Sequence, residues 1–514
     1  MRCLRIEHAC LPAATVYPQV FQLYTIRLFT LDVLRFGYVL GLGKSYPMDS
    51  KFIPNFDGLF NDRRLESRAS EFWDQLTTHQ VSVIRKMSKQ ASKRKAYYRL
   101  LSNPRVSEEK LIQETTDRLS RSCEGRHVLC IQDTSEINLS NHKGRIDRGS
   151  GLGRSDKADT AFCFKVHPTL VLDAHDLTPL GYSAIKVFHR SEEKPDRFTR
   201  NYKKQPIEEK ESYKWIESAQ MSKQTLQQAS SITFIEDREG DIYEQFARIP
   251  DSRTHLIIRS RTTRKLANGE DMYQKTLSSS VTGKYAVDVR DDIRKKQISR
   301  RAVIEVRFEE CMIQKPDSLS KQSHPPYIKL YCISAEEQSS AAHRIKWKLL
   351  TTHTIENFED AMQVIEWYAA RWYIEQVFRL LKSDGFNIES TEIESGWTIR
   401  KLLIMQLTCV LKIMQMHLSL IETSQGQPVE EVFNKDEIIV LTVLNKRLQG
   451  TTEMLKNPYP ESNVKWAAWI IARNGGWGGF KSERKPGVIT LKNGLDKFAL
   501  MVEAYKIFID VGKP

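Results

Sequence analysis

The stretch "YAARWYIEQVFRLLK", residues 368–382, combines residue types that could carry chemistry on one line. Its polar members are Tyr368, Arg371, Glu375 and Lys382. At about 100° per residue, a continuous helix would place these four side chains within about 60° of one another. One interpretation is a solvated face on which Arg371 and Glu375 form an ordinary i,i+4 ion pair. The other is a site in which the single acid acts beside an aromatic ring and two cations.

Two aspartates stand where buried strands are expected to end. Asp133 follows the apolar run 128–131, and Asp237 follows the run 232–235. If these strands are neighbours and the Glu375 helix packs across them, three carboxylates converge. Such a cluster repels itself unless cations occupy it, and hard oxygen ligands suit Mg²⁺ or Mn²⁺. Two such ions could activate a water or a 3′-hydroxyl for phosphodiester displacement. Aspartate at a strand end is also common turn chemistry, so this alternative stays open.

The elements that would position these residues alternate unevenly along the chain. Helical patterns from about residue 57 to 120 precede strand-like runs at 127–139, 164–174 and 181–188. A charged helical stretch near 208–229 then leads into the short apolar run before Asp237. This order predicts an α/β protein with a mixed sheet. Four further strand-like runs follow without intervening helices, which predicts an all-β insertion before the helix that carries Glu375.

A long helix is expected for that segment, with Thr354 as its N-cap and Gly385 at its end. Beyond Thr398 the chain is again helical, and residues 399–421 are apolar enough to be packed nearly all round.

The charge balance favours a polyanionic partner. The 514 residues include 78 Lys+Arg against 64 Asp+Glu, for a net charge of +14, which favours nucleic acid first and an acidic membrane second. Cations cluster in three segments: Arg85, Lys86, Lys89, Lys93, Arg94, Lys95 and Arg99; Arg259, Arg261 and Arg264; and Arg290, Arg294, Lys295, Lys296, Arg300 and Arg301. One such run is usually a solvated surface, but three together favour DNA or RNA.

Cysteine usage and hydropathy exclude several other classes. The eight cysteines form no CxxC pair, so a zinc site or a disulfide framework is not expected and reduced cytosolic thiols fit best. No uninterrupted apolar run reaches membrane-spanning length, and no membrane partner is expected. Residues 1–47 are interpreted as an extension of unknown role, with Met48 as an alternative start.

Three motifs together resemble one family. Tyr-x2-Arg-x3-Glu-x6-Lys at 368–382, "DREGD" at 237–241 and "QDT" at 132–134 match the Y-R-E-K signature and the aspartate motifs of bacterial cut-and-paste DDE transposases. The chain resembles the insertion-sequence-four family, and within it the Tn-five type. The segments "NDRRLESRASEFWDQL", "AYYRLLSNPRVSEE" and "VKWAAWIIARNGG" extend the likeness over about residues 57–497.

The resemblance implies a ribonuclease-H-like core in which Asp133, Asp237 and Glu375 bind two divalent metals and catalyse strand cleavage. It implies that Tyr368, Arg371 and Lys382 bind DNA phosphates, that Trp347 stacks a flipped base, and that Arg259 contacts the hairpin. Arg63, Arg64 and Arg68 would read the transposon end together with the 85–99 cluster. Trp347 could instead be a core tryptophan, and Arg259 a surface cation.

The resulting domain prediction has three parts after the extension. They are a helical DNA-end-binding domain at 48–118, a catalytic core at 119–415 with its β insertion at about 246–350, and a helical dimerisation domain at 416–514. The expected activity is nicking, hairpin formation, hairpin resolution and joining of 3′ ends to target DNA by a homodimer in the bacterial cytoplasm. Two alternatives stay open: a catalytically silent DNA-binding relative or inhibitor, and a stand-alone nuclease of the same fold.

Overall fold

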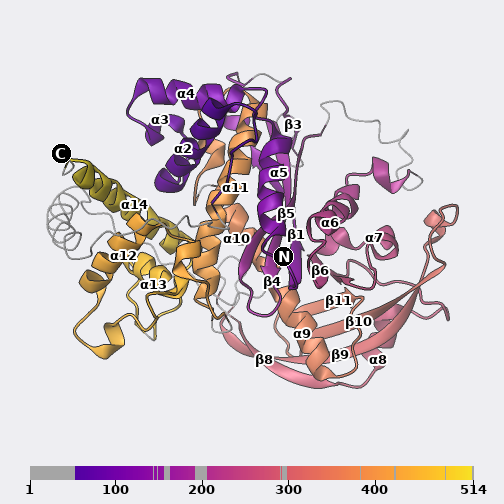
Figure 1. Ribbon diagram of the computed structural model, residues 1–514. Coiled ribbons are helices and arrows are strands. Elements are labelled where there is room, and N and C mark those ends of the chain that lie inside the picture. The colour runs from indigo at the N-terminus through magenta and orange to yellow at the C-terminus, as the bar shows by residue number, and fades with distance from the viewer. Residues whose placement is uncertain are drawn as a thin grey trace.

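The fold is seen in a computed structural model that describes residues 53–142, 144–146, 149–155, 162–190, 205–289, 291, 298–382, 384–421, 424–480 and 482–511 (Figure 1). The 1–47 extension and the cations Arg290, Arg294, Lys295 and Lys296 therefore lie outside the described residues.

A single mixed sheet organises the described part of the chain (Figure 1). Its strands are β1 (His127–Gln132), β2 (Ser135–Asn138), β3 (Gly153–Arg154), β4 (Phe162–Asp173), β5 (Pro179–Phe188), β6 (Ser231–Glu236), β7 (Thr254–Arg259), β8 (Gly283–Val289), β9 (Arg300–Gln314), β10 (Tyr327–Glu337) and β11 (Lys346–Thr351). They follow the order β2-β4-β1-β6-β7-β11-β10-β9-β8, with β3 and β5 also paired to β4. The mixed sheet expected from the sequence is confirmed: β1, β6 and β7 run parallel, and the remaining pairs are antiparallel.

The sheet is buried on both faces because its central strands are nearly continuous apolar runs. Ile131 and Ile235 belong to the core on one face, which includes α9 (Phe358–Ala369), α10 (Trp372–Leu381) and α11 (Gly396–Ser419). Cys130 and Phe234 belong to the core on the other face, which includes α6 (Tyr213–Thr225) and α7 (Tyr243–Arg248). Side chains that alternate along β1 and β6 thus enter two different cores.

The helices cover the sheet and gather at one end of the molecule, where α12, α13 and α14 form the C-terminal group in Figure 1. They are α2 (Arg63–His79), α3 (Ile84–Met87), α4 (Ala91–Ser102), α5 (Glu108–Ser120), α6 (Tyr213–Thr225), α7 (Tyr243–Arg248), α8 (Met272–Ser278), α9 (Phe358–Ala369), α10 (Trp372–Leu381), α11 (Gly396–Ser419), α12 (Lys435–Leu448), α13 (Val464–Asn474) and α14 (Val488–Val511).

The insertion differs from the all-β prediction. Strands β8 to β11 extend the core sheet beyond β7, but helix α8 lies within the insertion and packs on β9 and β10. Asp271 caps α8 by accepting a hydrogen bond from the Gln274 N–H. The helix was missed because it is only 7 residues long, too short to show a helical period.

The single long helix predicted around Glu375 is also wrong. The chain forms α9 and α10, separated at Ala370 and Arg371 by a turn with i→i+3 bonds such as Arg371 N–H to Tyr368 C=O. Asn357, not Thr354, caps α9 by accepting from the Asp360 N–H. Helix α10 ends at Leu381, before Gly385.

Helix α11 is the central helix of the α-helical side. The prediction that it is packed nearly all round is confirmed, since 94% of its most apolar 18-residue window is buried. It passes a length-and-composition test for a membrane span, but core helices of globular proteins pass the same test. The Trp73 indole N–H on α2 donates to Thr408 Oγ1 on α11 at 2.7 Å, so the N-terminal helices dock directly on it.

The predicted domain boundaries after residues 118 and 415 fall inside α5 and α11. Each boundary lies within the last turn or so of its helix, and the division into parts stays a prediction. The assignment of roles to those parts stays a prediction.

Candidate active site

The register of the parallel strands brings two of the predicted carboxylates together. β1 pairs with β6 up to Ile131 and Ile235, and the same offset two residues later sets Asp133 beside Asp237. Both follow the same side of the sheet as those isoleucines, which is the side covered by α9 and α10. The strand-end prediction therefore yields neighbouring aspartates at one edge of the sheet.

Backbone N–H groups hold both aspartates. Asp133 Oδ1 accepts from the Thr134 N–H at 2.7 Å. Asp237 caps a short 3₁₀ turn, and its Oδ1 accepts from the Glu239 N–H at 2.7 Å. Turn chemistry and a possible functional role thus coexist at each residue, and neither excludes the other.

Glu375 reaches the aspartates through Arg371. The Arg371 guanidinium, on a residue only 5% exposed, donates to Asp133 Oδ2 at 2.9 Å and to Glu375 Oε1 at 2.5 Å. The i,i+4 pair anticipated on a solvated face is therefore real, but its Arg371 side is buried and also binds Asp133, while Glu375 is partly exposed. This double ion pair makes Arg371 the counter-ion of the carboxylate cluster.

Burial shapes the electrostatics of the cluster. Desolvation raises the pKa of Asp133 to about 7; the Arg371 guanidinium opposes that rise, while the Asp237 and Glu375 carboxylates add to it. Desolvation also raises the pKa of Asp237. Carboxylates that are costly to ionise and close to one another are typical of sites that need additional positive charge.

The donor set fits a divalent cation by chemical type, because carboxylate oxygens are the ligands that Mg²⁺ and Mn²⁺ prefer. The arrangement is nevertheless not a preformed metal site. Across the described ranges, no three His, Cys, Asp or Glu side chains are grouped so that they could hold a metal ion. Binding a cation at Asp133 and Glu375 requires these carboxylates to exchange their Arg371 contacts for the ion.

Two of the other predicted DNA contacts, Tyr368 and Trp347, are buried. Tyr368 is 1% exposed and Trp347 is 4% exposed, and their rings meet edge to face at 5.1 Å between centroids. Arg259 lies diagonally from Trp347 on the same face of the sheet and donates to the Lys346 carbonyl at 3.2 Å. Lys382 is the C-cap residue that directly follows α10. A base could stack on Trp347 only after Trp347 or Tyr368 moved.

The three arginines of α2 lie on a different element. Arg63, Arg64 and Arg68 line a surface hollow together with Ser67 and Glu71. Arg68 also forms an ion pair with Glu71. Their common surface agrees with a role as one group, but it is not part of the carboxylate cluster.

The contacts of Asp241 were not predicted from the sequence. Asp241, the last residue of "DREGD", is fully buried and forms an ion pair with Arg264, and it accepts from the Arg261 N–H at 2.7 Å. This contact ties the turn after Asp237 to the start of the insertion. The motif spacing was visible, but the partner more than 20 residues away was not.

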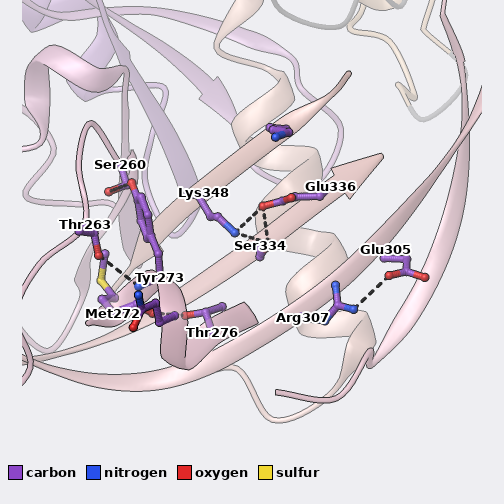
Figure 2. A network of polar contacts seen from close by, with 12 residues as sticks. Ser260, Thr263, Met272, Tyr273, Thr276, Glu305, Arg307, Ser334, Glu336 and Lys348 are labelled. Carbon is purple, nitrogen blue, oxygen red and sulfur yellow. Dashed lines mark hydrogen bonds and ion pairs between the residues drawn. The ribbon is translucent and has the colours of Figure 1, made fainter. Parts of the chain in front are cut away.

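A polar network lies on the opposite face of the insertion sheet from Trp347 (Figure 2). Lys348 binds Glu336 Oε1 at 2.5 Å and Ser334 Oγ at 2.7 Å. The Tyr273 hydroxyl donates to Ser260 Oγ at 2.8 Å. The Lys348 contacts join β11 to β10, and the Tyr273 contact joins α8 to the residue that follows β7. The Lys348 contacts therefore stabilise the strand that carries Trp347.

Two aspartates on neighbouring parallel strands, and a glutamate brought to them from a helix, define a carboxylate site of the kind used in metal-dependent chemistry. Residues 186–412 match the family model described as "Transposase DDE domain". This match includes Asp237 and Glu375 and begins after Asp133, and it supports a transposase of the DDE class.

Several solved chains are similar to this chain. One of them is described as "Cryo-EM structure of piggyBac transposase synaptic complex with hairpin DNA (SNHP)", and it is 11% identical over 87% of this chain and 89% of that chain, with a TM-score of 0.36. A likeness at that TM-score carries no argument about function.

Proposed function

We propose that this protein is a DDE DNA transposase of the insertion-sequence-four type. It would cut at the terminal inverted repeats of its element, form and resolve hairpin ends, and join the 3′ ends to target DNA. The observation that carries the proposal is the carboxylate cluster: Asp133 beside Asp237 in register, with Glu375 tied to Asp133 through Arg371. The family match supports the class of enzyme.

The proposed catalytic core is ribonuclease-H-like. Support comes from the strand path β5-β4-β1-β6-β7, in which the first three strands are antiparallel and the last two join β1 in parallel. Asp133 and Asp237 then follow the first and second parallel strands, as the resemblance implies for the first two acids of the triad.

Asp133, Asp237 and Glu375 would hold two Mg²⁺ ions, with Mn²⁺ as a substitute. When bound, the ions would activate the attacking water or 3′-hydroxyl and stabilise the leaving oxygen. The protein contributes rigid strand ends, backbone N–H groups that orient both aspartates, and an arginine that offsets part of the negative charge of the cluster. Arg371, once released by a cation, would be available to a DNA phosphate.

Trp347, Tyr368, Arg259 and Lys382 would contact DNA beside the cut. The side-by-side placement of Trp347 and Tyr368, with Arg259 on the same sheet face, supports a common role at the hairpin. Arg63, Arg64 and Arg68 would contact the transposon end, and their shared surface hollow supports this.

The proposed assembly is a homodimer on DNA in the bacterial cytoplasm, associated with the nucleoid. Exposed apolar side chains on α14 support a further protein contact: Leu500, Ile507 and Phe508 are 45%, 57% and 39% exposed.

Glu375→Gln tests the proposal, with Glu366→Gln as the matched control on an exposed position of α9. The wild type and the control should nick a terminal inverted repeat in Mg²⁺, whereas Glu375→Gln should not, although it still shifts the DNA on a gel. Cleavage by Glu375→Gln at the wild-type rate would reject the site.

The alternative is a catalytically silent DNA-binding relative, and the Arg371 ion pairs are the observation in its favour, because they engage two of the three acids. A wild-type protein that binds the inverted repeat but leaves it uncut in both Mg²⁺ and Mn²⁺ would establish this alternative.

A further inference from the structure

The ladder that supports Asp133 is interrupted on the neighbouring strand. β4 pairs with β1 up to Gln132 and Thr169, and with β2 from Ser135 and Val166 onward. Asp133 and Thr134 therefore face Pro168 and His167, between the two paired segments. Proline has no N–H to donate, so the regular backbone ladder is interrupted where Asp133 leaves the sheet.

The side chain of His167 bonds to the residues on both sides of Asp133. Its Nδ1 lies 2.9 Å from Thr134 Oγ1, and its Nε2 lies 3.3 Å from Gln132 Oε1. The ring is fully buried and meets the Trp215 indole of α6 edge to face at 4.8 Å. Because Gln132, Thr134 and His167 share the α6 side of the sheet, the ring works from behind the strand, on the face opposite the Asp133 carboxylate.

These contacts continue to the carboxylate through one peptide unit. Thr134, which His167 binds through the hydroxyl, donates its backbone N–H to Asp133 Oδ1 at 2.7 Å. Holding the Thr134 side chain on the α6 face of the sheet therefore also holds the Thr134 N–H, which orients the Asp133 carboxylate on the opposite face.

The surroundings of the ring favour its neutral form. Burial holds the pKa of His167 well below its ordinary value; Lys214 and Lys186 act in the same direction, and a hydrogen bond with the backbone of Asp133 opposes them. A third cation, Lys165, lies two residues away on the same face of β4 and is paired with Glu211. The neutral ring has one N–H donor and one acceptor nitrogen, and Gln132 Oε1, the Thr134 hydroxyl and the Asp133 backbone offer partners for both.

We propose that His167 is a positioning residue for Asp133: it replaces the missing ladder contacts opposite Pro168 and so holds the Asp133 carboxylate ready to bind a divalent cation. This inference rests on the proposed function, because the cation is the one expected at the carboxylate cluster. Partners that hold a metal ligand in place are commonly worth about 10- to 100-fold in metal affinity.

The test is Mn²⁺ binding by the DNA-free protein, measured by isothermal titration at pH 8 beside a melting curve. His167→Phe keeps a ring against Trp215 but removes both nitrogens, and Thr134→Val removes only the hydroxyl. Each should weaken Mn²⁺ binding about tenfold. His167→Asn restores an acceptor near the Nδ1 position and should recover most of the affinity.

Ser183→Ala is the matched control for a purely structural loss. Ser183 Oγ donates to Ser222 Oγ at 2.8 Å across the same β-sheet–α6 interface, without contact to Asp133. This variant should lower the melting temperature and leave Mn²⁺ affinity unchanged.

The double variant His167→Phe/Thr134→Val should bind Mn²⁺ no more weakly than either single variant, because both changes break one path. Wild-type affinity in His167→Phe and Thr134→Val, or additive losses in the double variant, would overturn the inference. If His167→Phe does not fold, Thr134→Val decides alone.

Asp133→Asn provides the reference for a lost ligand. A wild type that binds Mn²⁺ no better than Asp133→Asn means that the proposed metal site itself has failed. A wild type that binds better, with His167→Phe and Thr134→Val equal to it, means that only the positioning role has failed.

Discussion

The same parallel strands gather acids at one end and imidazoles at the other. β1 begins at His127 and leads to Asp133, and β6 carries Thr233 and leads to Asp237. At the imidazole end, Thr233 Oγ1 lies 2.8 Å from His127 Nε2 and 2.9 Å from His353 Nε2. His255 stacks on His353 at 4.1 Å, and Trp367 packs against His127 and His353 at 5.0 and 5.2 Å.

Burial favours the neutral form of the titratable groups at both ends of these strands. The two ends differ in whether the charge and hydrogen bonds of these groups are satisfied within the protein. Burial lowers the pKa of His353 to about 3, and the neighbouring His255 and His127 act in the same direction. The neutral imidazoles of His127 and His353 share the Thr233 hydroxyl as a hydrogen-bond partner and carry no charge that needs a counter-ion. At the other end, burial raises the pKa of Asp133 to about 7, yet its carboxylate faces two others and depends on Arg371 for charge. The comparison shows that burial alone does not mark a functional site. A cluster of titratable groups indicates a ligand-binding site when the protein does not fully balance its charge.

Asp133→Asn should have the largest effect and separate activity from stability. Cleavage of an inverted repeat in Mg²⁺ should fall below detection, because a neutral amide is a poor ligand for a hard cation. The melting temperature in metal-free buffer at pH 8 should equal or exceed that of the wild type, since the variant no longer buries an ionised carboxylate. Quantified cleavage products and a melting curve check both points. A clear fall in melting temperature would show that Asp133 is chiefly structural.

Two tryptophans, Trp347 on β11 and Trp367 on α9, give the next comparison. Trp347→Ala should spare the first nick and reduce hairpin formation roughly five- to 150-fold, if a flipped base gains about 1–3 kcal/mol by stacking there. Trp367→Ala, at the imidazole end, should lower the melting temperature and leave the ratio of hairpin to nicked product unchanged.

Because Trp347 is buried against Tyr368, its loss should also lower the melting temperature. The product ratio on a denaturing gel is therefore the decisive measurement. Nicking and hairpin formation that fall together in Trp347→Ala would assign Trp347 to the core alone.

The sequence predicted the strands well because their apolar runs are long and both faces are buried. The Asp133 and Asp237 strand ends followed from these runs, and the cluster with Glu375 could be proposed before the fold was known. The helical-wheel argument was less reliable. It put Tyr368 and Glu375 on one line, but the turn at Ala370–Arg371 sends Tyr368 into the core against Trp347.

The role of His167 could not be predicted from the sequence, for a different reason. Its role depends on which residue of β4 faces Thr134, and strand register across 33 residues is not encoded in any local pattern. Pro168 in an otherwise buried strand was the available signal, since proline within a strand marks an interruption of the ladder.

The imidazole end predicts a loss of stability in acid. The pKa of His353 is lower in the folded protein than its unfolded value of 6.5, so the unfolded chain takes up the proton first. The stability is fully present above pH 6.5 and is lost as the pH falls toward 3. For His353 alone, the loss between pH 7 and pH 5 is about 2 kcal/mol. Urea unfolding at both pH values measures it.

His353→Gln keeps a hydrogen-bonding group beside Thr233 but cannot titrate, so its unfolding free energy should depend less on pH over this range. Exposed His343→Gln is the control and should keep the wild-type dependence. The raised pKa of Asp133 acts in the opposite direction, so the comparison is made between variants and not read from the wild type alone. Equal pH dependence in His353→Gln and the wild type would contradict the prediction.

Arg371 should show the smallest effect, and it tests the charge balance directly. A cation that binds Asp133 and Glu375 must displace two charge-assisted hydrogen bonds from Arg371. If that displacement costs about 1.5 kcal/mol, Arg371→Gln should bind Mn²⁺ about tenfold more tightly in the absence of DNA. The measurement should be made at pH 8.5, because losing the guanidinium also removes what opposes the rise in the pKa of Asp133.

DNA cleavage should fall in the same variant, since the proposed phosphate contact is lost. Arg379→Gln, also on α10, removes an exposed ion pair with Asp384, which lies beyond the end of the helix, and should change neither quantity. Tighter metal binding with weaker cleavage would establish Arg371 as the counter-ion of the resting cluster, whereas a loss of both would mean that Arg371 helps to build the cation site.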